Sequence, residues 1–187
     1  MALAEEHVAK RVVLGIGGGI AAYKVAFLAS RLVQEGVKVR VAMTPASLRF
    51  VGEVTFAGLT GSQPILSSTQ IDHDGSVPHI QAAQNADVYC IAPATAGVIA
   101  QLASGAADDP VALLALTVKC PIIVCPAMND AMWNAESVQA NVATLVSRGI
   151  EVLGPVTGHL AEGYDGIGRM IEPEAMLQRL LHLMQGS

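Results

Sequence analysis

The stretch Arg11-Val-Val-Leu-Gly-Ile-Gly-Gly-Gly19 decides the fold of this chain. Residues 11–16 predict a short buried strand because the run is almost entirely apolar. The glycines that follow form a turn, and residues 20–34 then carry apolar side chains at helical spacing up to Gly36, a usual helix end. Residues 37–43 predict a second strand. Such strand–turn–helix–strand units are right-handed and build parallel sheets.

The same alternation of strands and helices continues along the chain. Further strands are expected at residues 87–92, 122–125 and 151–153. Helices are expected at residues 45–50, 54–59, 80–85, 98–104, 111–118, 136–148 and 173–184. Strand and helix alternate roughly five times, which predicts an α/β fold with a doubly wound, largely parallel sheet and helices on both faces. Because the sequence has no internal repeat or linker, we expect a single domain over residues 1–187.

The composition limits the class of protein. Hydrophobic residues make up 52% of the 187 residues and charged residues only 14%, so a sizeable core is expected and part of the surface is expected to be buried in a homo-oligomer. The net charge of −5 gives no support for nucleic-acid binding. No apolar run reaches the roughly 18 residues that span a bilayer. The acidic N-terminal residues 1–10 do not resemble a signal peptide, so a cytoplasmic location without membrane attachment is expected.

The cysteines and the acidic residues do not predict a metal site. Cys90, Cys120 and Cys125 are odd in number and lack a repeated short spacing, which argues against a disulfide framework or a zinc site. Cys90 and Cys125 lie in apolar runs, so we interpret them as small buried hydrophobic residues. Asp72 and Asp74 flank a histidine, but no further ligands are spaced to complete a metal centre.

Small or polar residues follow each predicted strand, and ligands of open parallel sheets bind at the carboxyl ends of strands. The glycine turn opens a helix, so its free N–H groups could hold a phosphate, although its spacing equally suits a plain tight turn. Thr44 is placed for a ligand contact or for capping the helix of residues 45–50. Thr95 and Asn129 occupy corresponding positions. His79, at the start of a predicted helix, could be structural or catalytic.

The stretch Pro155-Val-Thr-Gly-His-Leu-Ala-Glu-Gly-Tyr-Asp-Gly-Ile-Gly-Arg-Met170 follows the last predicted strand. Its glycines allow positive φ angles and a close approach to a ligand. A long loop of this kind in a small domain is often a lid over a binding site. We therefore expect it to fold over a ligand bound at the edge of the sheet.

The motifs occur together in an order that resembles the flavin-containing cysteine decarboxylase family. That family includes phosphopantothenoylcysteine decarboxylases of coenzyme A synthesis and the peptidyl-cysteine decarboxylases that mature lantibiotic-type peptides. The resemblance covers residues 10–184, and Pro126-Ala-Met-Asn-x-x-Met-Trp133 is its most specific part. It rests on that motif together with Gly18-Gly-Ile-Ala-Ala-Tyr-Lys24, Met43-Thr44, Pro78-His79-Ile80, Pro93-Ala-Thr-Ala96, Gly105-Ala-Ala-Asp-Asp109 and Gly166-Ile-Gly-Arg-Met170.

This resemblance implies that the doubly wound sheet has a Rossmann-like (flavodoxin-like) fold. It also implies a homotrimer or homododecamer that binds FMN, or alternatively FAD, at the subunit contacts. It implies a flavin-dependent carboxy-lyase acting on a thiol with a neighbouring carboxylate. The implied cofactor-binding residues are Gly18, Gly19, Ile20, Thr44, Thr95, Ala96, Gly97, Val98, Ala127 and Met128. Gly97 departs from the pattern, since many family members have Asn there. The implied substrate-contacting and catalytic residues are Asn129, which would bind the substrate carboxylate, His159, Leu160 and Ala161, and the catalytic His79.

One departure from the family pattern leaves the product open. The coenzyme A branch usually has Ala-Cys-Gly in the lid, and its cysteine protonates the enethiol product of decarboxylation. This chain has Ala161-Glu162-Gly163. Glu162 could serve as the acid, because burial raises the pKa of a carboxyl group, and the product would then be 4′-phosphopantetheine. Alternatively, the chain is an oxidative decarboxylase of a peptide C-terminal cysteine, or a non-catalytic flavin-binding regulatory subunit.

Overall fold

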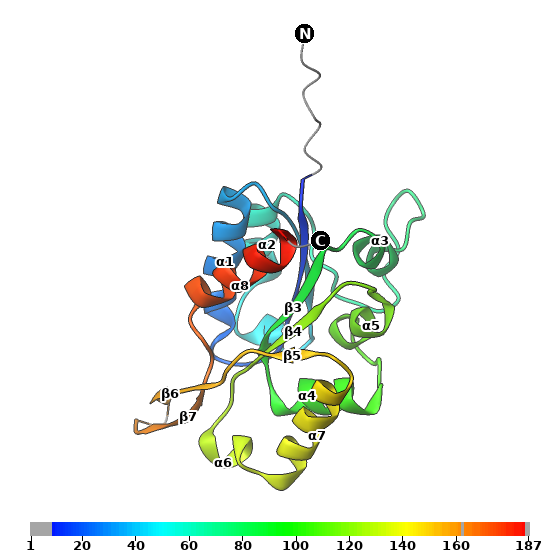
Figure 1. Cartoon of the computed structure of the whole chain (residues 1–187). Coiled ribbons are helices and arrows are strands. Elements are labelled where there is room, and N and C mark those ends of the chain that lie inside the picture. Colours follow the sequence, from blue (N-terminus) through cyan, green and yellow to red (C-terminus); the bar gives the residue numbers. More distant parts are fainter. Residues whose placement is uncertain (1–8, 162, 186–187) are drawn as a thin grey trace.

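The computed structural model describes residues 9–161 and 163–185, and its centre is the predicted parallel sheet (Figure 1). The five strands lie in the order β2-β1-β3-β4-β5, and every neighbouring pair is parallel. This is the flavodoxin-like order, so the predicted fold class is confirmed. The strand bounds are β1 Arg11–Ile16, β2 Lys38–Met43, β3 Val88–Ala94, β4 Ile122–Pro126 and β5 Glu151–Val152.

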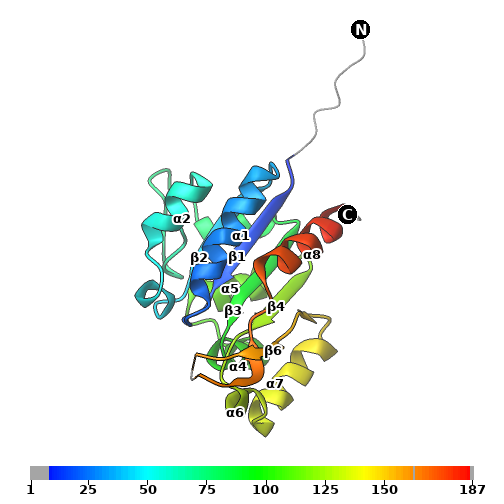
Figure 2. The same ribbon diagram turned by 90° about the vertical axis from the view of Figure 1, so that its left-hand side faces the viewer.

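Helices cover both faces of the sheet, and Figure 2 looks onto the face that carries α1 and α8. Side chains of α1, α2 and α8 form one core with alternate strand residues such as Leu14 and Cys90. Side chains of α3, α4, α5 and α7 form a second core with the intervening residues, such as Val13 and Tyr89. The helices are α1 Ala22–Gln34, α2 Glu53–Thr60, α3 Pro78–Gln84, α4 Ala96–Ser104, α5 Pro110–Thr117, α6 Asp130–Trp133, α7 Glu136–Ser147, α8 Pro173–Gln185 and the 3-10 helix Ser47–Arg49.

The second core contains a tyrosine that depends on a glycine. Tyr89 is fully buried, and its hydroxyl donates a hydrogen bond of 2.8 Å to the carbonyl of Val111 on α5. Burial holds the pKa of this phenol well above its usual range. A Cβ atom on Gly15 would lie 2.4 Å from the phenol oxygen, so glycine at this strand position makes room for the tyrosine.

The segment after β5 differs from the sequence-based expectation. Residues 155–170, expected to be a loop, contain an antiparallel hairpin of β6 (Val156–His159) and β7 (Asp165–Arg169). Its strands do not alternate cleanly between apolar and polar residues, and most of their side chains are exposed. Backbone pairing therefore defines the hairpin, which is why hydrophobic periodicity did not reveal it. The short helix α6 was also missed.

Among the described residues, no helix has the length and apolar character needed to cross a bilayer. Most predicted strands and helices otherwise lie within one or two residues of their expected bounds. The carboxyl ends of β1, β3 and β4 consequently lie side by side, and the hairpin β6–β7 projects from this edge of the sheet (Figure 1).

Candidate active site

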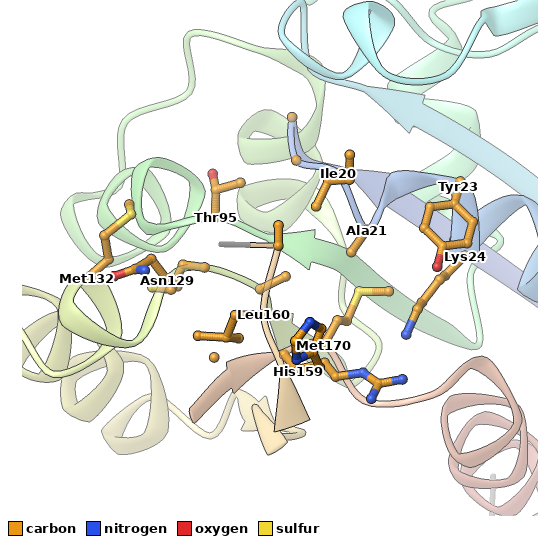
Figure 3. A pocket seen from close by; sticks show the side chains of 17 residues that line it. Ile20, Ala21, Tyr23, Lys24, Thr95, Asn129, Met132, His159, Leu160 and Met170 are labelled. Carbon is orange, nitrogen blue, oxygen red and sulfur yellow. The ribbon is translucent and has the colours of Figure 1, made fainter. Parts of the chain in front are cut away.

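A pocket of about 590 Å³ lies between the first turn of α1, the loop after β4 and the hairpin β6–β7. This volume is in the usual range for sites that hold a small molecule. Figure 3 shows Thr95, Asn129 and Met132 at one end of the pocket and Tyr23 and Lys24 at the other. The complete lining is Gly18, Gly19, Ile20, Ala21, Tyr23, Lys24, Thr95, Ala127, Met128, Asn129, Met132, His159, Leu160, Ala161, Gly168, Arg169 and Met170.

The glycine turn offers free backbone donors to this pocket. Within the part of the chain that the structure describes, the N–H groups of Gly18, Gly19 and Ile20 have no hydrogen-bond acceptor. They lie beside the N-terminus of α1, where the helix dipole favours an anion. A Cβ atom added to Gly19 would make only ordinary contacts, because the nearest atom, a methyl carbon of Thr95, would lie 3.6 Å away. The protein therefore does not require glycine at position 19, and an approaching ligand would explain it.

Gly18, in contrast, is required by packing within the protein itself. A Cβ atom there would lie 2.5 Å from the Cβ of Ala46, in the turn after β2. Thr44 in that turn is buried, and its Oγ1 accepts a hydrogen bond of 3.2 Å from the N–H of Ser47. Thr44 thus stabilises the turn that precedes the 3-10 helix, whose N-cap is Ala46, and it does not line the pocket.

Of the four predicted flavin contacts at the start of α4, only Thr95 lines the pocket. Its Oγ1 accepts a hydrogen bond of 3.4 Å from the N–H of Val98 and so caps α4. Ala96, Gly97 and Val98 belong to the first turn of α4, and Val98 is buried in the second core. A Cβ atom added to Gly97 would lie no closer than 3.9 Å to another atom, so there is room for a side chain at this position.

The loop after β4 supplies the other end of the pocket. Ala127 and Met128 line it, and Asn129 caps the short helix α6 through a hydrogen bond of 2.9 Å from the N–H of Ala131 to its Oδ1. The Nδ2 group of Asn129 donates to the hydroxyl of Tyr164 at 2.9 Å. Because Oδ1 is already engaged, the side chain of Asn129 presents donors, and one N–H remains for a ligand.

The hairpin is fastened to this same loop. The N–H of Met128 donates to the carbonyl of Gly168 at 3.0 Å, and a Cβ on Gly168 would lie 2.1 Å from the Met128 carbonyl oxygen. Gly168 also has a φ of +147°, which disfavours other residues. At the hairpin tip, the Tyr164 hydroxyl donates to Asp130 Oδ1 at 2.6 Å. These contacts place the hairpin over the pocket, as expected of a lid.

Of the four predicted substrate-contacting residues, all but Asn129 lie in this lid or directly after its first strand. His159, Leu160 and Ala161 all line the pocket, and Leu160 is the buried one of the three. His159 Nδ1 lies 3.4 Å from Asp165 Oδ1, across the hairpin. Glu162, the predicted acid, lies outside the described residues.

His79 is not part of this pocket. It lies in the first turn of α3, which is far from the hairpin in Figure 1, and its Nδ1 is buried without a hydrogen-bond partner. A buried imidazole nitrogen without a partner needs an explanation, such as a contact outside this chain. The structure therefore does not bring His79 together with Asn129 within one subunit.

Two cations that the sequence-based prediction did not assign to the ligand also line the pocket. Lys24 Nζ lies 2.9 Å from Glu172 Oε1 and 3.0 Å from Oε2, and Arg169 Nη2 binds the same carboxylate. The hydrogen bond from Lys24, with the charge of Arg169, holds the pKa of Glu172 below its usual range. Their place in Gly18-Gly-Ile-Ala-Ala-Tyr-Lys24 and Gly166-Ile-Gly-Arg-Met170 was a signal that these cations face a ligand.

No cysteine is among the described residues that line the pocket. Cys90 and Cys125 are buried in β3 and β4, as predicted. A hydrogen bond with Cys90, together with burial, holds the pKa of Cys125 well above its usual range. Burial likewise raises the pKa of Cys120 to about 11. The thiols of Cys120 and Cys125 are therefore protonated at neutral pH, and neither of them lines the pocket.

The described residues contain no group of three or more His, Cys, Asp or Glu side chains that could hold a metal ion. The chemistry available in the pocket is therefore that of backbone donors, an oriented amide, two cations and a lid. Such a set suits an elongated ligand with an anionic group. Of the predicted flavin and catalytic residues, the pocket lining lacks Thr44, Ala96, Gly97, Val98 and His79.

The sequence of this chain matches the model of a known protein family. The flavoprotein family model matches residues 2–185, nearly the whole chain. The chain belongs to the flavoprotein family. The sequence-based resemblance to flavin-containing cysteine decarboxylases is confirmed by relatives and solved structures to which this flavoprotein is similar.

Two relatives are bifunctional coenzyme A biosynthesis proteins called CoaBC. The protein of Mycobacterium tuberculosis is 41% identical over 169 residues, which is 90% of this chain and 40% of that protein. The protein of Mycolicibacterium smegmatis is 43% identical over 166 residues, covering 88% of this chain and 39% of that protein. The flavoprotein chain thus spans about two fifths of the length of these relatives.

Solved structures share the fold. A mutant PPC decarboxylase complexed with pantothenoylaminoethenethiol has a TM-score of 0.84 at 28% identity, covering 96% of this chain and all of that one. The FMN-dependent cysteine decarboxylase SpaF has a TM-score of 0.78 at 28% identity, covering 93% of this chain and 97% of that one. The flavoprotein fold is therefore that of the flavin-containing cysteine decarboxylases.

Proposed function

We propose that this chain is a flavin-dependent carboxy-lyase that decarboxylates phosphopantothenoylcysteine to 4′-phosphopantetheine in the cytoplasm. The observation that carries the proposal is the shared pocket, in which the glycine turn faces Asn129 and the lid residues His159 and Leu160. The similarity to the CoaBC proteins, at 41% and 43% identity, supports a substrate of coenzyme A synthesis.

The residues present fit a flavin mononucleotide. The unengaged N–H groups of Gly18, Gly19 and Ile20 suit its phosphate, and Ala127 and Met128 offer an apolar contact for its ring. FMN is the cofactor named for the similar protein SpaF, which favours FMN over FAD. When bound, the flavin supplies the two-electron oxidation of the substrate thiol and its reversal.

Asn129 is the proposed binding group for the substrate carboxylate. Its amide is oriented by Ala131 and Tyr164, so an N–H group is available to a carboxylate at this end of the pocket. The hairpin also lines this pocket, and its closure over a bound substrate would exclude water from that carboxylate. Removing water from a carboxylate raises its energy relative to neutral CO2, so this arrangement favours decarboxylation.

Protonation of the product needs an acid. Loss of CO2 from R–CH(COO⁻)–CH2–SH, with uptake of one proton at the same carbon, gives R–CH2–CH2–SH. Glu162 follows the pocket-lining Ala161 in the sequence, and we assign the proton to its carboxyl group. A second candidate function is favoured by the absence of a cysteine from the described pocket lining. It is the oxidative decarboxylation of a peptide C-terminal cysteine, with oxygen as the oxidant.

We further propose that the active unit is a homotrimer or an assembly of such trimers. Tyr23 and Phe27 on α1 and Ile20 in the turn before it have exposed side chains at a spacing of three and four residues, and Val54 on α2 is also exposed. A second copy of the chain that covers this part of the surface would bury them. The catalytic assignment of His79 then requires that a neighbouring copy bring its imidazole to the pocket.

Product analysis tests the proposal. The purified chain should bind FMN and turn yellow, and phosphopantothenoylcysteine should yield the saturated thiol by mass spectrometry. His79→Asn should retain FMN and lose decarboxylation. Glu162→Gln should shift the product to the enethiol, which is two hydrogens lighter. Turnover of a cysteine-ended peptide to that lighter product by the wild type would favour the second function, and no turnover of either substrate would refute both.

A further inference from the structure

The pocket carries a positive end that the proposed reaction does not use. Lys24 and Arg169 line it, whereas Glu172, the carboxylate between them, does not. No acidic side chain is among the described residues of the lining. Two cations share one carboxylate, so this cluster keeps a net positive charge and spare N–H donors toward the pocket.

Lys24 is held in place more firmly than a surface lysine. Its side chain is 13% exposed, against 51% for Glu172, and its ammonium contacts both carboxylate oxygens. Glu172 comes directly before α8, and Arg169 ends β7 of the hairpin. The ammonium of Lys24 is therefore shared with Glu172, and an anionic ligand would compete with that carboxylate for it.

This positive cluster and Asn129 lie at the two ends of the pocket, as the two charged groups lie at the two ends of the proposed substrate. Figure 3 shows Lys24 and Asn129 at opposite ends of the pocket. Phosphopantothenoylcysteine carries a carboxylate at its cysteine end and a phosphate monoester at the other. With its carboxylate on Asn129, the chain of the substrate would extend toward Lys24. Ammonium and guanidinium groups are the usual protein partners of phosphate.

We propose that Lys24 and Arg169, bridged by Glu172, form the subsite for the phosphate monoester of the substrate. This inference rests on the proposed function, and it explains how the enzyme would select a phosphorylated small thiol over a peptide. The free N–H groups at positions 18–20 form a separate donor set at the helix N-terminus. They suit the phosphate of the flavin, and Lys24 lies about one helical turn further along α1.

The ion cluster also joins α1 to the start of α8, and a structural role alone must be distinguished from phosphate binding. Arg31 provides a matched control, because its Nη2 lies 3.8 Å from Glu174 Oε1 and so joins the same two elements. Arg31 does not line the pocket. Arg31→Met therefore removes an ion pair between α1 and the start of α8 without changing the charge of the pocket.

The test measures binding to the full FMN-loaded chain, with 4′-phosphopantetheine and pantetheine as probes. The wild type should bind 4′-phosphopantetheine at least tenfold more tightly. Lys24→Met should weaken that binding by about 10- to 30-fold and leave pantetheine binding unchanged. Lys24→Arg should retain most of the preference, and Arg31→Met should retain all of it.

Glu172→Gln gives a result of opposite sign. Removing the carboxylate frees both cations, so binding of 4′-phosphopantetheine should tighten by about threefold or more. A structural clamp alone would instead make Glu172→Gln and Lys24→Met change binding in the same direction, which would overturn the proposal.

Two further outcomes would overturn it. One is a wild type that binds both probes equally. The other is a Lys24→Met variant that loses affinity for FMN but not for riboflavin, since the subsite would then belong to the flavin phosphate. Preference for the phosphorylated probe without any decarboxylation would support the subsite and refute the proposed reaction, so the two failures are distinguishable.

Discussion

The glycine turn after β1 and the hairpin β6–β7 both line the pocket and are both rich in glycine, but their glycines are required for different reasons. In the turn, a Cβ on Gly17 would lie 2.3 Å from the carbonyl oxygen of Pro93, deep in the sheet. In the hairpin, Gly168 allows contact with the loop after β4 through the carbonyl of Met128. Gly17 thus belongs to the core, whereas Gly168 belongs to a docking contact.

This difference indicates that the two sides of the pocket differ in local stability. The turn cannot change without disturbing β1 and β3, so the flavin end of the pocket should be as stable as the whole domain. The hairpin is exposed and is attached by few contacts, so it should open at a lower free energy than the domain unfolds. Such a division allows a lid to admit substrate while the cofactor end stays in place.

Gly17→Ala should give the largest loss of stability. The added methyl group meets a backbone oxygen that cannot move independently of β3, so the free energy of unfolding should fall by about 3 kcal/mol. Chemical denaturation measures the change. Gly97→Ala is the matched control, because its Cβ has no atom closer than 3.9 Å, and it should raise stability slightly in its helical position. If the two substitutions changed the free energy of unfolding equally, close packing against Pro93 would not be the reason for glycine at position 17.

Gly168→Ala should affect the lid far more than the domain. Strain at a φ of +147° and overlap with the Met128 carbonyl should cost the docked hairpin about 2 kcal/mol, or roughly 30-fold in turnover. Hydrogen exchange of the hairpin amides should quicken while the unfolding midpoint changes little.

Gly163→Ala separates strain from overlap at the lid. Gly163 also has a positive φ, of +92°, but nothing lies within 4 Å of its built Cβ. Its substitution should therefore have the smaller effect on turnover. If Gly163→Ala impaired turnover as much as Gly168→Ala, contact with Met128 would not be what docks the hairpin.

Tyr164→Phe should have a moderate effect confined to the hairpin tip. It removes the hydroxyl that binds Asp130 and accepts from Asn129, and one such hydrogen bond contributes about 1 kcal/mol. We expect KM to rise by about fivefold, with unfolding unchanged. A variant with wild-type KM but lowered stability would assign the hydroxyl to the fold instead of the lid.

The smallest expected effect is a dependence on pH at the junction of the hairpin with α8. The pKa of Glu172 is lowered from its ordinary value of 4.5 by Lys24 and Arg169. Its contribution to stability is therefore present above pH 4.5 and is lost as pH falls through the lower folded-state pKa. The stability difference between wild type and Glu172→Gln should shrink in that window. A difference that grew on acidification would contradict the sign.

The sequence predicted the sheet well, because apolar runs and glycine turns mark β1 to β4 and the helices between them. It missed β6 and β7, since backbone pairing and docking on Met128 hold these strands rather than an apolar face. At the site, motif resemblance selected residues that the structure gathers, such as Gly19 and Asn129. It could not reveal the bridge between Lys24 and Glu172, because a contact between distant residues has no local periodicity.

The cap of α6 links the folding of one short helix to the polarity of the pocket. Because Ala131 holds the Asn129 carbonyl oxygen, that amide cannot rotate to present an acceptor without uncapping the helix. A ligand carboxylate at this end would meet an Nδ2 hydrogen that is already oriented, whereas a donor group would have to share an amide oxygen that already accepts from Ala131, so binding should favour a carboxylate over an amidated terminus. Selectivity for an anion at this end of the pocket is thus built into the same bond that starts α6.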